Sequence, residues 1–260
     1  MWVSVAVTAV EEGSMLLTML LATALAQQPT TAEEIFERAQ SARNIDNSIQ
    51  TMRMVLISKN GAERVREMEL KVRRDGDVVS SYTRFTSPSD VSGTQLVMVD
   101  NPDQADDQLL YLPALQRVQR IAGRARTGAF MGSDFAFEDL ELSVSDSDQH
   151  TIVEETESHW IIESVPGEST LYARIRSTIR KTDSIPEQID YFDKKDQPLK
   201  RLTITQTEQD GDTVIPTISI MENLQKGTQT RLEIIEHQLN VTPEQIPDEV
   251  FTTTYMERHG

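Results

Sequence analysis

Apolar and polar residues alternate along residues 52–73 of the chain. The alternating apolar positions are Met52, Met54, Leu56, Met68, Leu70 and Val72. A period of two is typical of a β-strand that has one apolar face. The Asn60-Gly61 pair between the two runs predicts a hairpin turn, and Asp75-Gly76 predicts another. The pattern therefore predicts long antiparallel strands that share one apolar face.

The same alternation returns in the second half of the chain. It predicts strands over residues 151–155, 160–165, 171–179, 187–192, 199–207, 213–224 and 230–238. Pro216 has no backbone N–H, so we expect its strand to start after it or to lie at a sheet edge. About ten strands in total favour a mainly β domain with a minority of helix.

One segment, residues 30–43, follows the helical period instead. Its apolar face consists of Ile35, Phe36, Ala39 and Ala42. A threonine precedes the first turn, which carries Glu33 and Glu34, as is typical of a helix start. We expect this helix to pack against the sheet.

Residues 84–140 break the alternating pattern and form the stretch around which the chain is organised. Residues 94–99 and 107–113 are short apolar runs that predict a hairpin. A basic interval follows, with Arg117, Arg120, Arg124, Arg126, Gly123 and Gly128. Such a long interruption in a compact domain is usually functional, so we interpret it as a cover over a site.

The end of this stretch, residues 123–140, predicts a short apolar helix after the glycine-hinged segment. We expect Ser133 or Asp134 to cap the helix, with Glu138 and Asp139 in its first turn. Its apolar surface would come from Phe130, Met131, Phe135 and Phe137. These side chains would form either a fixed plug in the core or a movable lid over a cavity.

Composition narrows the compartment and the class of partner. The 260 residues are 38% hydrophobic and 26% charged, with a formal net charge of −17. This charge argues against nucleic acid, whose phosphates would repel the protein. Residues 15–26 are apolar and end in Ala24-Leu25-Ala26, which predicts a signal peptide over residues 1–26 that is removed before Gln27. Glu11 and Glu12 are unusual in a leader, so the start is either Met1 or Met15.

Catalytic and metal-binding patterns are sparse. The chain has no cysteine, which excludes an acylated N-terminal cysteine, and its four histidines, His150, His159, His237 and His259, show no paired spacing. The GAFMG run at residues 128–132 lacks the central serine of a nucleophile elbow. We therefore expect a protein that is not an enzyme and that needs no cofactor or metal.

The central stretch carries a family resemblance. Its motifs are RF-x-x-P, GT-x-L, YLPAL-x-RV-x-RI and FMGSDF-x-x-EDL, followed by YFDKKDQPLKRL, IPTISIMEN and IPDEVFTTTYMER towards the C-terminus. This series resembles the LolA-like family of bacterial periplasmic proteins, which are related to outer-membrane lipoprotein-sorting carriers and often accompany RND-type exporters. The resemblance implies a strongly curved antiparallel sheet, an unclosed barrel, in which helices cover an apolar cavity for acyl chains.

The resemblance implies one domain, residues 27–260, and a periplasmic location. We expect a monomer that acts as a carrier or chaperone for the acyl chains of lipids or lipoproteins. The expected cavity and lid residues are Phe85, Leu96, Tyr111, Leu112, Leu115, Phe130, Met131, Phe135, Phe137 and Leu140. Arg117 and Arg120 would bind a headgroup at the mouth, or else only neutralise nearby carboxylates. The alternative function is an accessory protein of an RND-type exporter with a plugged cavity.

Overall fold

The computed structural model describes residues 31–43, 45–100, 107–141, 148–167, 171–211 and 213–260. Residues 31–260 form one compact unit. The predicted signal peptide and its cleavage site lie outside the described residues.

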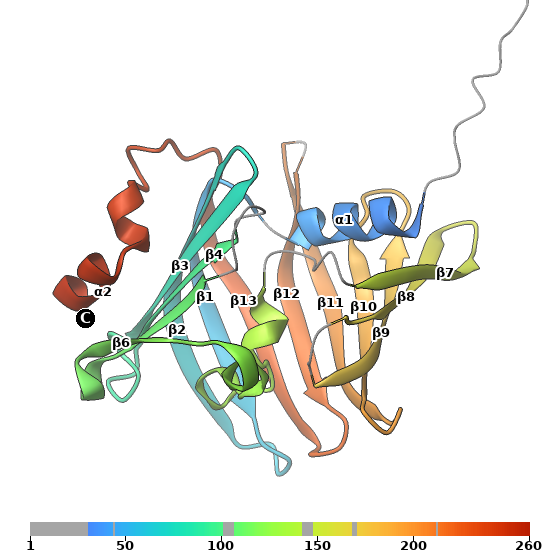
Figure 1. The fold of residues 1–260 in the computed structure, drawn as a ribbon, viewed down its shortest axis with the longest axis horizontal. Helices are drawn as coiled ribbons and strands as arrows, with labels where there is room; N and C mark the ends of the chain where they lie inside the picture. Colours follow the sequence, from blue (N-terminus) through green and yellow to red (C-terminus); the bar gives the residue numbers. More distant parts are fainter. Residues whose placement is uncertain (1–30, 44, 101–106, 142–147, 168–170, 212) are drawn as a thin grey trace, which may run out of the picture. The chain divides into compact units, whose positions relative to one another are not determined.

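A single antiparallel sheet of 13 strands makes up most of the described residues (Figure 1). The strands are β1 (Ser48–Ile57), β2 (Glu63–Asp75), β3 (Val78–Ser87), β4 (Gln95–Asp100), β5 (Asp107–Leu112), β6 (Arg117–Arg120), β7 (Gln149–Glu155), β8 (His159–Val165), β9 (Tyr172–Arg180), β10 (Pro186–Asp193), β11 (Pro198–Asp210), β12 (Thr213–Asn223) and β13 (Thr228–Gln238). Their order is β6-β5-β4-β3-β2-β1-β13-β12-β11-β10-β9-β8-β7. The first and last strands of the chain therefore meet at the centre, while β6 and β7 form the two edges.

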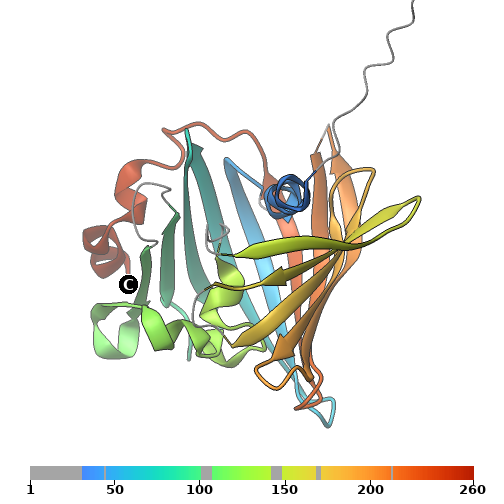
Figure 2. The same ribbon diagram turned by 45° about the vertical axis from the view of Figure 1, so that its right-hand side comes forward.

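The sheet curves strongly but does not close into a barrel (Figure 2). This confirms the predicted fold class. The three predicted hairpin turns are also present, because β1 pairs with β2, β2 pairs with β3 and β4 pairs with β5 in antiparallel register. Strands β3 and β6 were not predicted, and the C-terminal helix α2 (Thr253–His259) was not predicted either. Strand β3 shows no alternation because most of its residues are buried on both faces of the sheet.

The two faces of the sheet are covered by different parts of the chain (Figure 1). On the outer face of β3–β5, residues Tyr82, Val97 and Tyr111 pack with Val250 and Met256 from the C-terminal segment. On the inner face lies the largest core cluster, which includes Met54, Met68, Phe85, Leu96 and Leu202. The C-terminal segment thus protects the outside of one half of the sheet, and the concave inside faces the site described below.

Helix α1 (Ala32–Arg43) forms as predicted and covers the other half of the inner face (Figure 2). Thr31 Oγ1 accepts a hydrogen bond from the Glu34 N–H at 3.2 Å, and the Glu34 carboxylate accepts one from the Thr31 N–H at 3.1 Å. This reciprocal pair is a capping box that fixes the helix start. Ile35 and Ala39 pack on Ile162 of β8 and Ile179 of β9.

The expectation for Pro216 is wrong, because β12 starts before it and lies inside the sheet. Pro216 pairs with Thr207 of β11 where the register of that pair is irregular. The pairing of β12 with β13 begins only at Ile218. Pro216, which has no N–H, therefore lies in a part of β12 that pairs with β11 and not yet with β13.

The register of β2 gives a direct stability test. Leu70 faces the inner side, whereas the neighbouring Glu69 faces outward and pairs with Lys71 at 2.9 Å. We expect Leu70→Asp to cost several kcal/mol of unfolding free energy, because it places a carboxylate on the apolar face. Glu69→Gln should change it by less than about 1 kcal/mol. Urea unfolding measures both, and equal losses would contradict the register.

Candidate binding cavity

Residues 123–140, called the cover segment from here on, lie across the inner face of the sheet (Figures 1 and 2). They form three short 3₁₀ turns, Gly123–Thr127, Phe130–Gly132 and Phe137–Leu140. A β-bridge between Ala129 and Ala136 closes the loop between the last two turns. The expected acidic first turn is present, with Glu138 and Asp139.

The expected helix caps are wrong. The Asp139 carboxylate, not Ser133 or Asp134, accepts the Ala136 N–H, at 2.6 Å. Asp134 instead anchors the cover segment to the sheet, because its carboxylate accepts hydrogen bonds from the hydroxyls of Thr228 and Thr230 on β13, the latter at 2.9 Å.

The phenylalanines of the cover segment point into the largest core cluster. The rings of Phe130 and Phe137 meet edge to face, with centroids 5.6 Å apart, and Phe130 lies 5.8 Å from Phe85 of β3. Phe135 is also buried. Arg66 of β2 donates a hydrogen bond to the Met131 carbonyl and so fastens the Phe130–Gly132 turn to β2.

A cavity of about 210 Å³ remains between the cover segment and the sheet. Most of its wall is apolar. The lining residues are Gln40, Arg43, Ile45, Gln50, Met52, Met54, Met68, Leu70, Val72, Ser81, Thr83, Leu96, Met98, Phe130, Phe135, Asp139, Leu140, Glu141, Leu202, Ile204, Pro216, Ser219, Leu232 and Ile234. Its volume is below the roughly 300 Å³ typical of ligand pockets, because Phe130 and Phe135 occupy part of the concave space.

A second cavity of about 130 Å³ adjoins the first under α1. The two share Gln40, Arg43, Asp139 and Glu141. The wall of the second cavity is richer in polar groups and also includes Arg126 and Glu138. Two mostly apolar cavities, the second with more charged side chains in its wall, thus meet at the C-terminal end of α1.

A buried charged cluster ties the cover segment to the second half of the sheet. The Asp139 carboxylate lies 2.9 Å from Lys200 Nζ on β11, and the same Nζ lies 2.9 Å from the Tyr172 hydroxyl on β9. Tyr172 donates its hydroxyl proton to the other Asp139 oxygen at 2.5 Å. Burial, followed by the Asp139 charge, raises the pKa of Tyr172 well above its ordinary value. The phenol therefore stays protonated and acts as a donor.

Most predicted cavity residues lie in or against this core. The inner cluster contains Phe85, Leu96, Phe130, Phe135 and Phe137, and the residues packed against it include Leu112, Met131 and Leu140. Of these, Leu96, Phe130, Phe135 and Leu140 line the cavity itself.

Four predicted site residues are elsewhere. Tyr111 faces outward and packs under the C-terminal segment, because neighbouring strand residues face opposite sides. Leu115 is 51% exposed. Arg117 and Arg120 are exposed on edge strand β6, where Arg120 pairs with Asp107 at 2.5 Å. The arginines that line the cavities are Arg43 and Arg126 instead.

Several lining residues were not predicted as site residues. The methionines Met52, Met54 and Met68 line the cavity but were not among the predicted site residues, because core filling is the commoner use of methionines on an inner strand face. Their spacing was the available signal, since flexible thioethers on an inner face suit an adaptable apolar pocket. Gln50 lies on the same face of β1 as Met52 and Met54, and a polar residue at that position indicates a polar patch in the wall.

Glu138 makes stability depend on pH. Its carboxylate accepts the Leu171 N–H at 3.0 Å, and burial raises its pKa to about 7. An acid whose pKa is raised on folding holds its proton more tightly in the folded state. Stability therefore falls as pH rises from about 4.5 to about 7, and it stays low above that range.

We expect Glu138→Gln to leave stability near the parental value at pH 4 and to raise it by about 1 kcal/mol at pH 8, a figure reduced for the partial solvent exposure of this group. Urea unfolding at the two pH values measures the effect. Glu157→Gln, in an exposed turn, is the control and should change neither value. A variant less stable than the parent at pH 8 would contradict the raised pKa.

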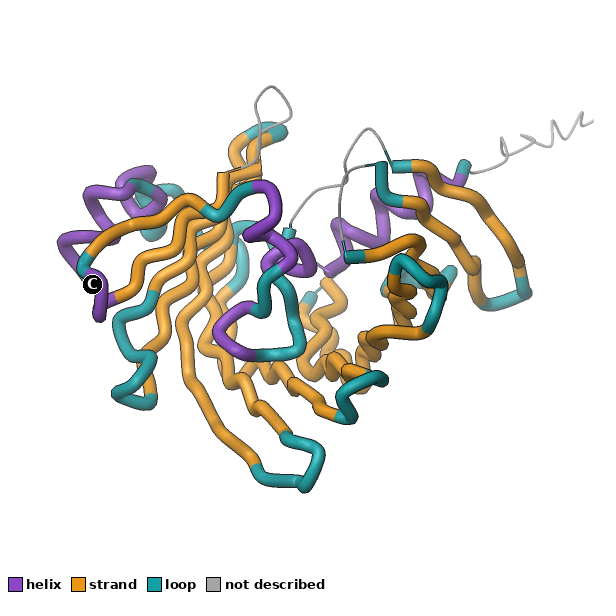
Figure 3. Tube along the Cα trace, turned by 60° about the horizontal axis from the view of Figure 1, so that its bottom comes forward, coloured by secondary structure: helices purple, strands orange, loops and turns teal. Residues whose placement is uncertain are grey.

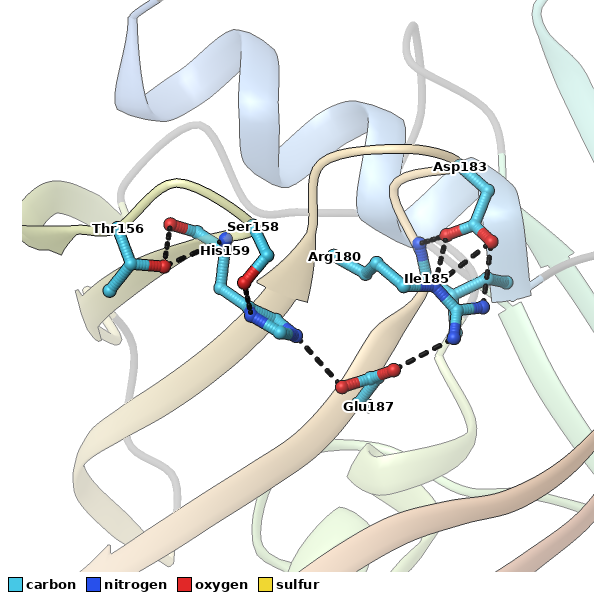
Figure 4. Close-up of polar contacts among 7 residues, drawn as sticks. All are labelled: Thr156, Ser158, His159, Arg180, Asp183, Ile185 and Glu187. Carbon is cyan, nitrogen blue, oxygen red and sulfur yellow. Dashed lines mark hydrogen bonds and ion pairs between the residues drawn. The ribbon is translucent and has the colours of Figure 1, made fainter.

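A separate polar network lies at the start of β8 (Figure 4). Ser158 Oγ lies 2.9 Å from His159 Nδ1, and His159 Nε2 lies 2.8 Å from Glu187. The order serine, histidine, carboxylate is that of a hydrolase triad, but the other Glu187 oxygen accepts a 2.7 Å bond from Arg180, which also pairs with Asp183. Neither cavity reaches these residues. The network fastens the β9–β10 turn to β8.

No group of three or more His, Cys, Asp or Glu side chains is placed to hold a metal ion among the described residues. Nor do the described ranges include a helix long and apolar enough to cross a membrane.

Several solved structures share the architecture that Figure 3 shows for this chain. A candidate outer membrane lipoprotein-sorting protein domain from Vibrio parahaemolyticus is 30% identical, with a TM-score of 0.75 over 86% of this chain and 97% of that one. A DUF1329 family protein from Desulfovibrio piger is 23% identical, with a TM-score of 0.76 over 87% and 99%. A LolA superfamily protein from Nitrosomonas europaea shares the fold at 18% identity, with a TM-score of 0.67 over 86% and 99%.

The curved open sheet is thus the fold of the lipoprotein-sorting class. A family model described as an uncharacterized protein matches residues 77–258, and no curated protein matches the chain. This chain belongs to the LolA-like family, which confirms the resemblance seen in its motifs.

Proposed function

We propose that the protein is a carrier or chaperone that shields acyl chains of lipids or lipoproteins in the bacterial periplasm. The observation that carries the proposal is the apolar cavity under the cover segment, with methionines from β1, β2 and β4 in its wall. The lipoprotein-sorting name of the Vibrio relative supports the same role. Burial alone gives useful affinity, because each methylene removed from water contributes about 0.8 kcal/mol.

Organic extraction of protein purified from its native compartment, followed by mass spectrometry, tests this function. We expect a co-purifying acyl lipid in the parental protein. Met52→Trp should reduce its amount severalfold, because Met52 lines the cavity and a larger ring would fill it. Val65→Trp on β2 is the matched control, since Val65 is 45% exposed on the outer side, and it should retain the lipid.

Absence of lipid from both the parent and the control would contradict the carrier function. It would favour the alternative, an accessory protein of an RND-type exporter whose cavity is plugged. The present position of Phe130 and Phe135 in the cavity wall is the observation that keeps this alternative open.

A further inference from the structure

The apolar cavity has one polar end. Gln50 on β1 and Ser81 and Thr83 on β3 line it, and all three are buried. Strand register places Gln50, Leu70 and Thr83 in one row across the sheet, and Ser81 in the next row beside Val72. The three polar side chains therefore form one patch on an otherwise apolar face.

Ser81 is the most informative member of this patch. Its side chain is 1% exposed, and its hydroxyl has no hydrogen-bond partner within the described part of the chain. A buried hydroxyl without a partner costs free energy, so such groups are uncommon in native proteins. A hydroxyl that faces a cavity can instead bond to a ligand there.

Arg43 also lines this cavity. It is the last residue of α1, which leads directly into β1, and its guanidinium donates to the Gln40 side chain at 3.1 Å. Among the described residues no carboxylate lies within ion-pair distance of it. The cavity-wall carboxylates Asp139 and Glu141 are paired with Lys200 and Arg126.

Among the described residues of this wall, Arg43 is therefore the charged side chain without a counter-charge. The second cavity, on the other side of Arg43, also contains Glu138 and Asp148, whose carboxylates accept the backbone N–H groups of Leu171 and Gly167. An anionic group would consequently be held from the first cavity, which Arg43 and Ser81 both line.

The opposite end of the cavity is apolar. Its lining residues are Met54 and Met68 from the sheet and Phe130 and Phe135 from the cover segment. Met54 follows Gln50 by four residues on β1, a separation of about 13 Å at about 3.3 Å per residue. The wall thus changes from polar to apolar along the strand direction.

We propose that the cavity binds a single-chain amphiphile with an anionic oxygen headgroup in one fixed direction. The headgroup accepts hydrogen bonds from Arg43 and Ser81, and the chain runs along β1 towards the cover segment. A fatty-acyl carboxylate is the simplest ligand of this class. The inference rests on the proposed carrier function and adds the headgroup chemistry and the orientation to it.

Calorimetric titration with dodecanoate, dodecanol and dodecyltrimethylammonium tests the headgroup. We expect dodecanoate to bind most tightly. Arg43→Gln should weaken dodecanoate by about tenfold or more, as expected for a lost bond to a charged group, and should leave dodecanol unchanged. Ser81→Ala should weaken dodecanoate by about fivefold.

Two matched controls separate these effects from general damage. Ser80→Ala changes the neighbouring residue of β3, which is also buried but faces the outer side, and Arg117→Gln changes an exposed arginine of β6. Neither should affect binding. Equal affinity for the three probes, or equal weakening of dodecanoate and dodecanol by Arg43→Gln, would overturn this inference while the carrier function stood. Failure of every probe to bind would count against both.

Photo-crosslinking tests the direction. A dodecanoate analogue with a diazirine at the end of its chain should label peptides that contain Met54, Met68 or Phe135. The same group beside the carboxylate should label peptides that contain Gln50 or Ser81. Identical labelling by the two analogues, read by mass spectrometry, would overturn the fixed direction.

Discussion

Lys200→Met is expected to lower the free energy of unfolding by about 3–5 kcal/mol. The lysine is buried, and its removal leaves the Asp139 carboxylate, whose side chain is 1% exposed, without a counter-charge. Among the residues that the structure describes, the Tyr172 hydroxyl and the Ala136 N–H would still donate to that carboxylate. An uncompensated buried charge is far more costly than the loss of an exposed ion pair.

The control for this change is Lys181→Met. Lys181 pairs with Glu155 at 2.7 Å, but Glu155 is 57% exposed in its side chain, so the cost should be at most about 1 kcal/mol. Urea unfolding measures both variants. The double variant Asp139→Asn/Lys200→Met should lose less than the two single changes together, because both charges are removed at once.

Limited proteolysis gives an independent measurement for the same cluster. Asp139 holds the end of the cover segment against β9 and β11, so the loss of Lys200 should expose the peptide bonds after Arg124 and Arg126 to trypsin. Additive losses of stability together with unchanged cleavage would show that the cluster does not hold the cover segment.

This cluster illustrates the limit of the sequence pattern. Lys200 lies between the apolar residues Leu199 and Leu202 in β11 and reads as an exposed position of a half-buried strand. Its partner Asp139 is 61 residues away, and no local pattern joins the two. Buried ion pairs depend on tertiary contact, so only the folded chain reveals them.

The strands show where the pattern succeeds. Alternation predicted β1 and β2 because each has one face on the core and one face in solvent. It missed β3, which the C-terminal segment covers from outside and the core covers from inside, so both sets of side chains are buried. The motif resemblance supplied the curved, unclosed sheet, which periodicity alone does not specify.

The basic residues show why the site was only partly predicted. Arg117 and Arg120 are close to the cover segment in sequence, yet their strand lies at the sheet edge. Arg43 is about 80 residues from the cover segment and reaches the cavity because α1 crosses the open side of the sheet. Proximity along the chain is a poor guide to which cation faces a cavity.

Phe135→Ala is expected to cost about 3 kcal/mol of stability, the low end of the range for buried phenylalanines, and to increase uptake of a fluorescent fatty-acyl probe severalfold. Phe135 is buried in the core cluster and also lines the cavity, so its ring occupies space that an acyl chain would use. If the cover segment is movable, removing the ring lowers the competition for that space. Titration with the probe and urea unfolding measure the two effects.

A fixed plug predicts no increase in probe uptake. Phe135→Ala would then cost up to about 5 kcal/mol and leave an empty cavity without a gain in binding. Phe137→Ala provides a second variant from the same cluster, while Phe251→Ala, which changes a residue packed on the outer face, is the control and should not alter uptake. Because a movable cover predicts increased probe binding and a fixed plug predicts no increase, a loss of stability in both cluster variants does not obscure the result. Unchanged uptake in both would favour the exporter-accessory alternative, since the carrier requires that these phenylalanines yield to an acyl chain.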